Sequence, residues 1–215
     1  MMDTLQLPTS RTAYRLGKRA FDLMVSVLLL PPAALLGAVI AVLLKVSSPG
    51  PVFYRHVRVG RQAKAFHLWK FRTMVHNGEQ LFLMHLAENA AARHEWERYR
   101  KLRRDPRVTK IGAFLRKTNL DELPQLINVL RGEMSLVGPR PIMLEEMERY
   151  GAGSDLYTAV LPGITGMWQV GGRCALPYER RVALDVEYVC TWSFGRDLAI
   201  LVSTLRALPG GRGAF

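Results

Sequence analysis

The clearest potential for chemistry lies in two adjacent acids, Asp121 and Glu122, within a segment that reads RKTNLDELPQL over residues 116–126. Pro124 has no amide hydrogen and therefore suits the first turn of a helix. Asp121 is then a candidate N-cap, surrounded by free amides and by the positive end of the helix dipole, which keep a carboxylate ionised. Arg116 lies close by and carries a guanidinium fork suited to a phosphate. A helix cap with no catalytic role would use the same acids.

Two stretches rich in glycine and proline follow, and each contains an arginine. Residues 137–141 read VGPRP, which places Arg140 between two prolines on a stiff backbone. Residues 162–173 read PGITGMWQVGGR and end at Arg173. Glycines let backbone amides approach a ligand closely, although they also occur in plain turns. Together with the acidic pair, these arginines predict a site for a phosphate-bearing substrate.

One segment of the sequence, within residues 18–48, is apolar and long enough to enter a membrane, and it must position this chemistry. It exceeds the length of about 20 residues that a straight span needs. Pro31 and Pro32 at its centre remove two amide donors and oppose a straight helix. Basic residues flank it on both sides, which favours a cytoplasmic location for both ends.

We therefore expect a re-entrant membrane helix over residues 18–48, broken at Pro31 and Pro32, while a simple span stays open. The run is too long for a signal peptide, and no small-residue cleavage site follows it. Residues 1–17 are expected to form a basic leader, and residues 49–215 a cytoplasmic catalytic domain.

Composition narrows the class of partner. Lys and Arg number 30 against 18 for Asp and Glu, a net charge of +12 that suits nucleic acid, anionic lipid or phosphate-bearing substrates. Positive-inside charge on a membrane protein would give the same excess. The two cysteines, Cys174 and Cys190, and five scattered histidines have no metal-ligand spacing, so we expect reduced thiols and no zinc site.

Apolar periodicity predicts an α+β fold that is mainly helical. Short strands are expected at residues 52–55 and 65–72, and helices at residues 79–102, 121–131, 142–150, 177–190 and 197–208. The last helix carries an apolar stripe of Leu198, Leu201, Val202 and Leu205. It could lie in the membrane interface or pack on the core.

The motifs LDELPQ (residues 120–125), VGPRP (residues 137–141) and PGITG (residues 162–166) resemble those of the monotopic phosphoglycosyltransferases, the bacterial sugar transferases that begin polysaccharide assembly. The resemblance extends from the KRAFD segment at residues 18–22 to the C-terminus. The short chain and the segment RKLRRDPRVT at residues 100–109 look most like members that initiate exopolysaccharides. Those of similar size in rhizobia transfer galactose 1-phosphate.

The resemblance implies a reaction in which a hexose 1-phosphate, with galactose 1-phosphate favoured, moves from a UDP-sugar to undecaprenyl phosphate and UMP is released. Asp121 would be the nucleophile that forms an aspartyl phosphosugar, and Glu122 would help it hold Mg2+. The implied phosphate and nucleotide contacts are Arg116, Arg140 and Arg173, and we also expect Arg72 and Gln169 to bind substrate. For Arg72, plain surface charge is the alternative.

The same resemblance implies a monotopic protein of the bacterial inner membrane whose catalytic domain, with amphipathic interfacial helices, faces the cytoplasm. Its partners would be the UDP-sugar, undecaprenyl phosphate, the lipid bilayer and downstream glycosyltransferases, and relatives suggest a homodimer. Two departures from the family pattern are Gly171, where members often carry serine or asparagine, and Pro31-Pro32 where the break is often Ser-Pro.

Two non-catalytic alternatives remain at this stage. A membrane-tethered binder of nucleic acid or anionic lipid would use the excess charge and the basic and aromatic residues at 66–72. No recognised nucleic-acid module occurs, so we expect no nucleic-acid partner. A membrane-anchored scaffold would not need Asp121, Glu122 or Arg140, so substitution of Asp121 separates both alternatives from an enzyme.

Overall fold

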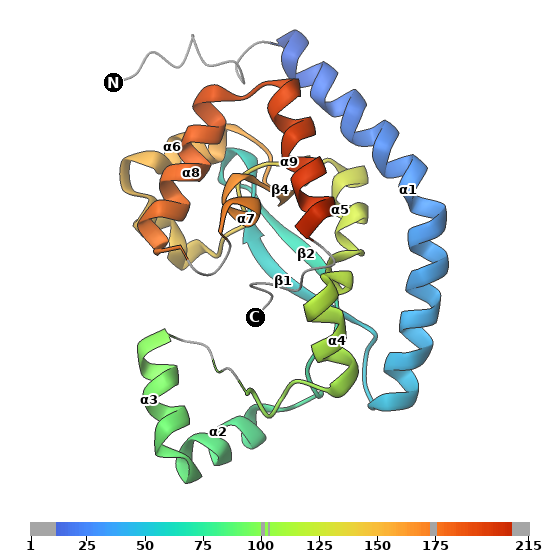
Figure 1. The fold of residues 1–215 in the computed structure, drawn as a ribbon, viewed down its shortest axis with the longest axis vertical. Helices are drawn as coiled ribbons and strands as arrows, with labels where there is room; N and C mark the ends of the chain where they lie inside the picture. Colours follow the sequence, from blue (N-terminus) through green and yellow to red (C-terminus); the bar gives the residue numbers. More distant parts are fainter. Residues whose placement is uncertain (1–11, 100–101, 103, 173–175, 208–215) are drawn as a thin grey trace.

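The computed structural model describes residues 12–99, 102, 104–172 and 176–207. A body of short helices and two small sheets lies beside one long N-terminal helix (Figure 1), which confirms the predicted mainly helical α+β class. The elements in chain order are α1 (Thr12–Ser47), β1 (Phe53–Val59), η3 (Arg61–Ala63), β2 (Ala65–Phe71), α2 (Glu79–Glu88), α3 (Ala90–Tyr99), α4 (Lys110–Thr118), η4 (Leu120–Glu122), α5 (Gln125–Arg131), β3 (Ser135–Val137), η5 (Leu144–Gly153), α6 (Ser154–Ala159), β4 (Gly163–Thr165), α7 (Met167–Gly171), α8 (Tyr178–Thr191) and α9 (Phe194–Ala207).

The larger sheet is an antiparallel hairpin of β1 and β2, which sits at the centre of the body (Figure 1). Side chains alternate between the two faces of a strand. The pairing of Tyr54 with Lys70 and of His56 with Leu68 therefore puts these residues, and Arg58, on one face. The outer edge of β2 is closed by Asn128 of α5, whose side chain accepts from the Trp69 amide and donates to the His67 carbonyl.

The smaller sheet joins β3 and β4 in parallel. Its strands approach each other so closely that a Cβ on Gly138, just after β3, would lie 2.6 Å from the Leu161 carbonyl oxygen. A Cβ on Gly163 would lie 2.1 Å from the Gly138 nitrogen. These two glycines are thus required by contact between backbone segments of the chain itself.

The main core lies between the hairpin, β3 and the C-terminal helices. Its fully buried members include Val129, Val137, Tyr188 and Val189. A second cluster joins Ile40 and Leu44 of α1 to Phe71 and Leu115. The second cluster fixes the C-terminal end of α1 to the body.

α1 is longer than expected and continues through Pro31 and Pro32. It changes direction along its length without ending (Figure 1), so the predicted break is replaced by a bend within one helix. Proline removes a helical hydrogen bond and clashes with the preceding turn, which favours a bend in a helix that contains Pro31 and Pro32. The helix already includes residues 12–17, which we assigned to the leader, and residues 1–11 lie outside the described part.

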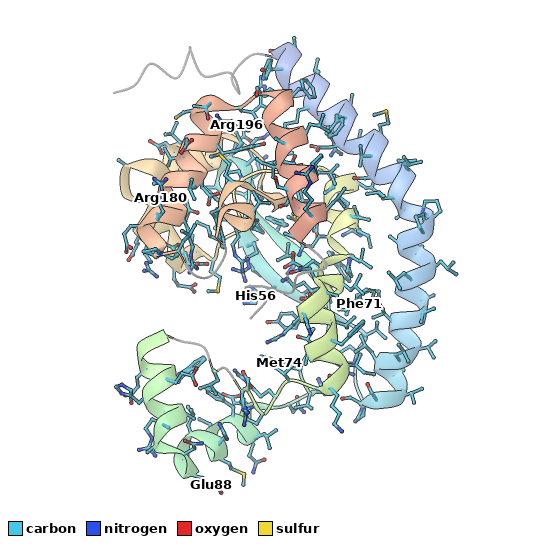
Figure 2. All side chains as sticks on the ribbon, in the orientation of Figure 1. His56, Phe71, Met74, Glu88, Arg180 and Arg196 are labelled. Carbon is cyan, nitrogen blue, oxygen red and sulfur yellow. The ribbon has the colours of Figure 1, made fainter. Side chains whose placement is uncertain are left out.

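Most of the apolar surface of α1 faces away from the body. Its most apolar 18-residue stretch is only 11% buried, and α1 is long and apolar enough to cross a membrane by length and composition. The exposed large side chains are Leu16, Met24, Val27, Leu28, Leu29, Leu30, Leu35, Leu36, Val39, Val42, Leu43 and Val46. In Figure 2, side chains project from the outer side of α1 with no other segment of the described chain beside them.

α2 and α3 form a lobe that stands apart from the body in Figure 1. Figure 2 labels Met74, where the chain leaves the body, and Glu88 at the far end of the lobe. Arg107 joins the lobe to its base by stacking on Phe82 at 4.0 Å and by bonding to Asp105. The predicted single helix over residues 79–102 is wrong, because Asn89 is extended and its side chain caps α3 at the Ala92 amide.

The remaining helix predictions had mixed outcomes. α8 and α9 confirm the helices expected near residues 177–190 and 197–208. The segment at residues 142–150 is a 3-10 helix, and the helix expected at residues 121–131 is divided into η4 and α5. Asp121 is therefore not the N-cap of α5, since Pro124 occupies that position.

Candidate active site

Asp121 is placed by a sharp change of direction between two helices. α4 ends at Asn119, which has a φ of 56° and donates its amide to the Arg116 carbonyl. Asparagine tolerates this left-handed conformation better than most residues, so it suits a helix end. The chain then forms the short turn η4, in which Asp121 is 8% exposed.

The acidic pair faces a lysine from the central hairpin. The Lys70 ammonium of β2 donates to Glu122 Oε1 at 2.6 Å and lies 3.8 Å from Asp121 Oδ2. Gln125, which is 2% exposed, also hydrogen-bonds the Glu122 carboxylate. Lys70 thus joins two adjacent carboxylates from across the site.

The two carboxyls differ in acidity although they are neighbours. Burial raises the pKa of Asp121 to about 6, and the Glu122 charge adds to this, while Lys70 and Arg116 oppose it. Burial would also raise the pKa of Glu122, but the Lys70 ammonium and its hydrogen bond hold that pKa below its usual value. Near neutral pH both groups are therefore ionised, and Asp121 is the more basic of the two.

Arg116 lies beside Asp121 and is held by the start of the lobe. Its Nε donates to Thr73 Oγ1 at 2.9 Å, directly after β2. Among the acidic residues, Asp121 contributes most to stabilising the positive charge of Arg116. The sequence prediction that Arg116 accompanies Asp121 is thus matched by the geometry.

A small cavity opens beside the acidic pair and is rich in cations. Arg140 and Gln169 line it together with Glu122, as expected for three of the predicted site residues. The full lining comprises Arg58, Leu68, Lys70, Glu122, Gln125, Arg140, Pro141, Gly163, Ile164 and Gln169. Three cationic side chains against one carboxylate make this cavity suited to an anion.

Arg140 is positioned by its neighbours and by a buried acid. Its guanidinium lies over the Trp168 ring at 5.5 Å. Asp185 of α8 accepts from the Tyr150 hydroxyl at 2.7 Å, and its carboxylate interacts electrostatically with Arg140. Burial raises the pKa of Asp185 to about 7.

Two predicted residues are not brought to this cavity. Arg72 is 7% exposed and donates to the carbonyls of Pro49 and Ser48 at 2.5 and 2.8 Å, so it fastens the chain after α1 to β2. A substrate contact for Arg72 stays a prediction that these bonds do not support. Arg173 lies outside the described residues.

The carboxylates of the site suit a metal ion that takes most of its ligands from substrate and water. Among the described residues, no group of three or more His, Cys, Asp and Glu could hold a metal ion. Asp121 and Glu122 offer two carboxylates, and Mg2+ is commonly held by one or two carboxylates together with substrate phosphates and water. The pair therefore fits Mg2+ bound together with a phosphate substrate, provided that the Lys70–Glu122 bond breaks when the metal binds.

Sequence reasoning missed Lys70, Gln125 and Arg58. Strand alternation could have found Lys70, since it falls on the opposite face from Trp69 and Phe71. Gln125 carried no signal beyond its place after Pro124. Arg58 could be assigned only once β1 was seen to lie beside the loop of Arg140.

A family model described as "Bacterial sugar transferase" matches residues 13–210. The exopolysaccharide production protein ExoY of Sinorhizobium fredii is 44% identical over 200 residues, which are 93% of this chain and 88% of that protein. The undecaprenyl-phosphate galactose phosphotransferase of Salmonella typhimurium is 45% identical over 216 residues, 100% of this chain and 45% of that protein.

A third relative differs in the sugar that its name gives. The undecaprenyl-phosphate glucose phosphotransferase of Komagataeibacter xylinus is 41% identical over 215 residues, 93% of this chain and 37% of that protein. The chain thus spans less than half the length of both phosphotransferases and most of the length of ExoY. The family match covers every residue placed around the acidic pair, and the chain belongs to the bacterial sugar transferase family.

Proposed function

We propose that this protein transfers a hexose 1-phosphate from a UDP-sugar to undecaprenyl phosphate and so begins an exopolysaccharide repeat unit. The observation that carries the proposal is the acidic pair at the edge of a cationic cavity: Asp121 and Glu122 face Lys70, with Arg116 beside Asp121. The relatives named for undecaprenyl-phosphate sugar phosphotransfer support the reaction class.

In the first step, an Asp121 carboxylate oxygen attacks the donor phosphorus that bears the sugar. A bond forms between that oxygen and phosphorus, and the bond from phosphorus to the UMP oxygen breaks, so that UMP leaves with the electron pair. Lys70, Arg116 and the cavity arginines offset the repulsion between a carboxylate and a diphosphate. Burial supports this role because it makes Asp121 more basic than an exposed aspartate.

In the second step, a phosphate oxygen of undecaprenyl phosphate attacks the same phosphorus. The Asp121 carboxylate leaves, and the product is an undecaprenyl diphosphate sugar. Glu122, with Asp121, would hold Mg2+, which when bound neutralises charge on the diphosphate. Splitting the transfer in two lets donor and lipid use the site in turn.

We infer that α1 enters and leaves the membrane from one side. Its N-terminal part reaches the body through Lys18, whose ammonium lies 2.5 Å from Asp197, and through Arg19, which donates to the Leu130 carbonyl at 3.0 Å. Its C-terminal part is held by Leu44 in the second core cluster and by the Arg72 bonds that follow it. A helix of 36 residues is about 54 Å long, yet both ends contact the same body.

Placement of that body in the cytoplasm rests on the basic residues at both ends of α1. The protein is then monotopic in the bacterial inner membrane. α9 supports contact with the lipid surface, because Leu198, Val202 and Leu205 are exposed while Ile200 is buried in the core. This arrangement would bring Asp121 to the level at which a lipid phosphate sits.

Galactose 1-phosphate is the favoured group, because one relative that matches the whole of this chain is named for galactose. The name of another gives glucose, so a donor screen decides between them. A homodimer and handover to downstream glycosyltransferases remain predictions.

The test combines membranes containing the protein with undecaprenyl phosphate, Mg2+ and, in turn, UDP-galactose, UDP-glucose and their N-acetyl forms. UMP release should depend on one donor, and D121N should abolish it. Donor labelled in the sugar should leave a covalent label on the wild-type protein when lipid is omitted. The substitution E145Q, at an exposed acid outside the site, should change neither readout.

Active membranes in which D121N still releases UMP would contradict the assignment of the nucleophile. Active membranes that never yield a labelled protein would contradict the covalent step. Absence of UMP release with every donor would instead favour a membrane-anchored binder or scaffold.

A further inference from the structure

Arg58 of β1 is a charged residue of the cavity that no motif singled out. Its side chain is 16% exposed and lines the cavity with Lys70, Glu122 and Arg140. It extends from the same face of the hairpin as Lys70, since Tyr54 pairs with Lys70 and side chains alternate along β1. This position lies beside the acidic pair but on a different element from Arg116.

The Arg58 guanidinium is incompletely neutralised. Within the described residues, its Nε is buried and has no hydrogen-bond partner. Its ion pair with Glu146 is long, at 3.5 Å, and Glu146 Oε2 also accepts from the Met143 amide at 2.8 Å. An unpaired buried donor on a cation is costly unless a ligand satisfies it.

A second cation lies close to the first. Burial lowers the pKa of Arg58, and the nearby charge of Arg140 lowers it further. Two like charges in one cavity repel each other, so an anion that bridges them is bound more tightly.

The backbone holds the two arginines together. The Val59 amide, next to Arg58, donates to the Ile142 carbonyl at 2.9 Å, close to Arg140. The Tyr157 hydroxyl donates to the Val59 carbonyl and accepts from the Ile142 amide, at 2.9 and 3.2 Å. The backbone segments that carry the two arginines are therefore held together before a ligand binds, which lowers the cost of bringing both side chains to one ligand.

We propose that Arg58 and Arg140 together bind the diphosphate of the nucleotide-sugar donor, with Arg58 as a substrate-binding residue of this site. The inference rests on the proposed function for the identity of the donor. Two guanidinium forks lining one cavity match the oxygens of a nucleoside diphosphate. Lys70 and Arg116 lie beside Asp121 and would act at the phosphorus under attack.

The test measures binding of UDP to the purified full-length protein in detergent with Mg2+ by calorimetry, together with donor KM and kcat in membranes. R58M should weaken UDP binding and raise donor KM by about 10- to 100-fold, the range of a lost charge-assisted hydrogen bond, with a smaller change in kcat. R58K keeps the charge without the fork and should fall between R58M and the wild type.

Two control variants separate binding from structure. R55M removes a cation from the opposite face of the same strand and should leave UDP affinity unchanged. E146Q removes the only ion-pair partner seen for Arg58 among the described residues and should leave UDP affinity unchanged or increase it. Thermal unfolding of each variant reports on folding.

Equal losses in R58M and E146Q would show that Arg58 acts only as a structural ion pair. UDP affinity and donor KM within twofold of the wild type in R58M would also overturn the proposal, and R58K with E146Q decides the matter if R58M does not fold. UDP titration does not require turnover. Failure of the wild type to release UMP would therefore count against the proposed function, while the titration still tests Arg58.

Discussion

Asp121 and Glu122 are neighbours in the chain, yet their environments make them different acids. Asp121 is 8% exposed and lies 3.8 Å from the Lys70 ammonium, whereas Glu122 bonds it at 2.6 Å. Burial is the largest single effect on the pKa of each group, but for Glu122 the charge and hydrogen bond of Lys70, with Arg140 and Gln125, together outweigh it. Divergent acidity within one pair is a common sign of separate roles in catalysis.

The first prediction concerns the pH dependence of donor turnover. Because the pKa of Asp121 is raised to about 6, the carboxyl is protonated below that pH and cannot attack phosphorus. We expect donor kcat/KM to fall about tenfold per pH unit below about pH 6 and to be level above it. UMP release between about pH 4.5 and 8 measures this, and the inflection should move to lower pH as Mg2+ is increased.

Substitution of Lys70 tests whether Asp121 controls this pH profile. K70M removes the ammonium that lowers the pKa of Asp121, so the inflection should move to higher pH and the rate above it should fall. R55M, on the other face of the hairpin, should leave the profile unchanged. An inflection that does not move in K70M would mean that another group controls the profile.

The second prediction concerns Asp185 and the pH dependence of stability. Its pKa is raised to about 7 in the folded protein, so the folded state retains a proton that the unfolded state releases near about pH 4. Stability should therefore decrease as pH rises from about 4 to about 7. Urea unfolding in detergent at about pH 5 and about pH 8 should show a shallower decrease for D185N, which still accepts from Tyr150. The same pH dependence in both proteins would contradict this account.

At the scale of elements, the sequence predicted best the helices and strands whose apolar periodicity extends over many residues. The β1–β2 hairpin, α8, α9 and the apolar helix carry such patterns, and the structure contains them. β3 and β4 have three residues each, too few for a period, and their parallel pairing depends on glycines far apart in the sequence.

The acidic pair was predicted from local residue types, but its surroundings were not. Asp121, Glu122 and Arg116 are close in sequence, so one turn brings them together. Lys70 and Arg58 come from strands far away in the chain, and only the hairpin register reveals which face they occupy. Arg72 looked like a substrate contact because basic residues on a strand carry no signal of burial; its bonds to Ser48 and Pro49 depend on the path of the chain after α1.

The third prediction tests Arg72 as a fastening between α1 and β2. R72M removes both bonds and leaves the buried Ser48 carbonyl without the Arg72 donor, so we expect a loss of about 1–3 kcal/mol in the free energy of unfolding. Donor KM should change less than twofold. Thermal unfolding and UMP release measured on the same preparation separate the two effects. A raised KM with unchanged stability would restore Arg72 as a phosphate contact.

At the scale of the whole molecule, the last prediction is that both flanks of α1 face one compartment. Cysteines introduced at the exposed positions Thr12 and Lys64, in a variant with Cys174 and Cys190 replaced by serine, should react with an impermeant maleimide in inside-out vesicles. Neither should react in intact spheroplasts, and a cysteine at Leu28 should be protected in both. Labelling of the two flanks from opposite sides would contradict the re-entrant arrangement.

The contacts that a membrane-spanning α1 would lose support this prediction. A spanning α1 would have to separate Lys18 from Asp197, whose carboxylate is 1% exposed and also accepts from Tyr188 and Trp192. Removing one partner of a buried ion pair typically costs about 3–5 kcal/mol. Either the N-terminal contacts, including the Arg19 bonds to α5, or the Leu44 packing would be lost as well. One continuous body held at both ends of a bent helix is therefore compatible with entry and exit through a single leaflet.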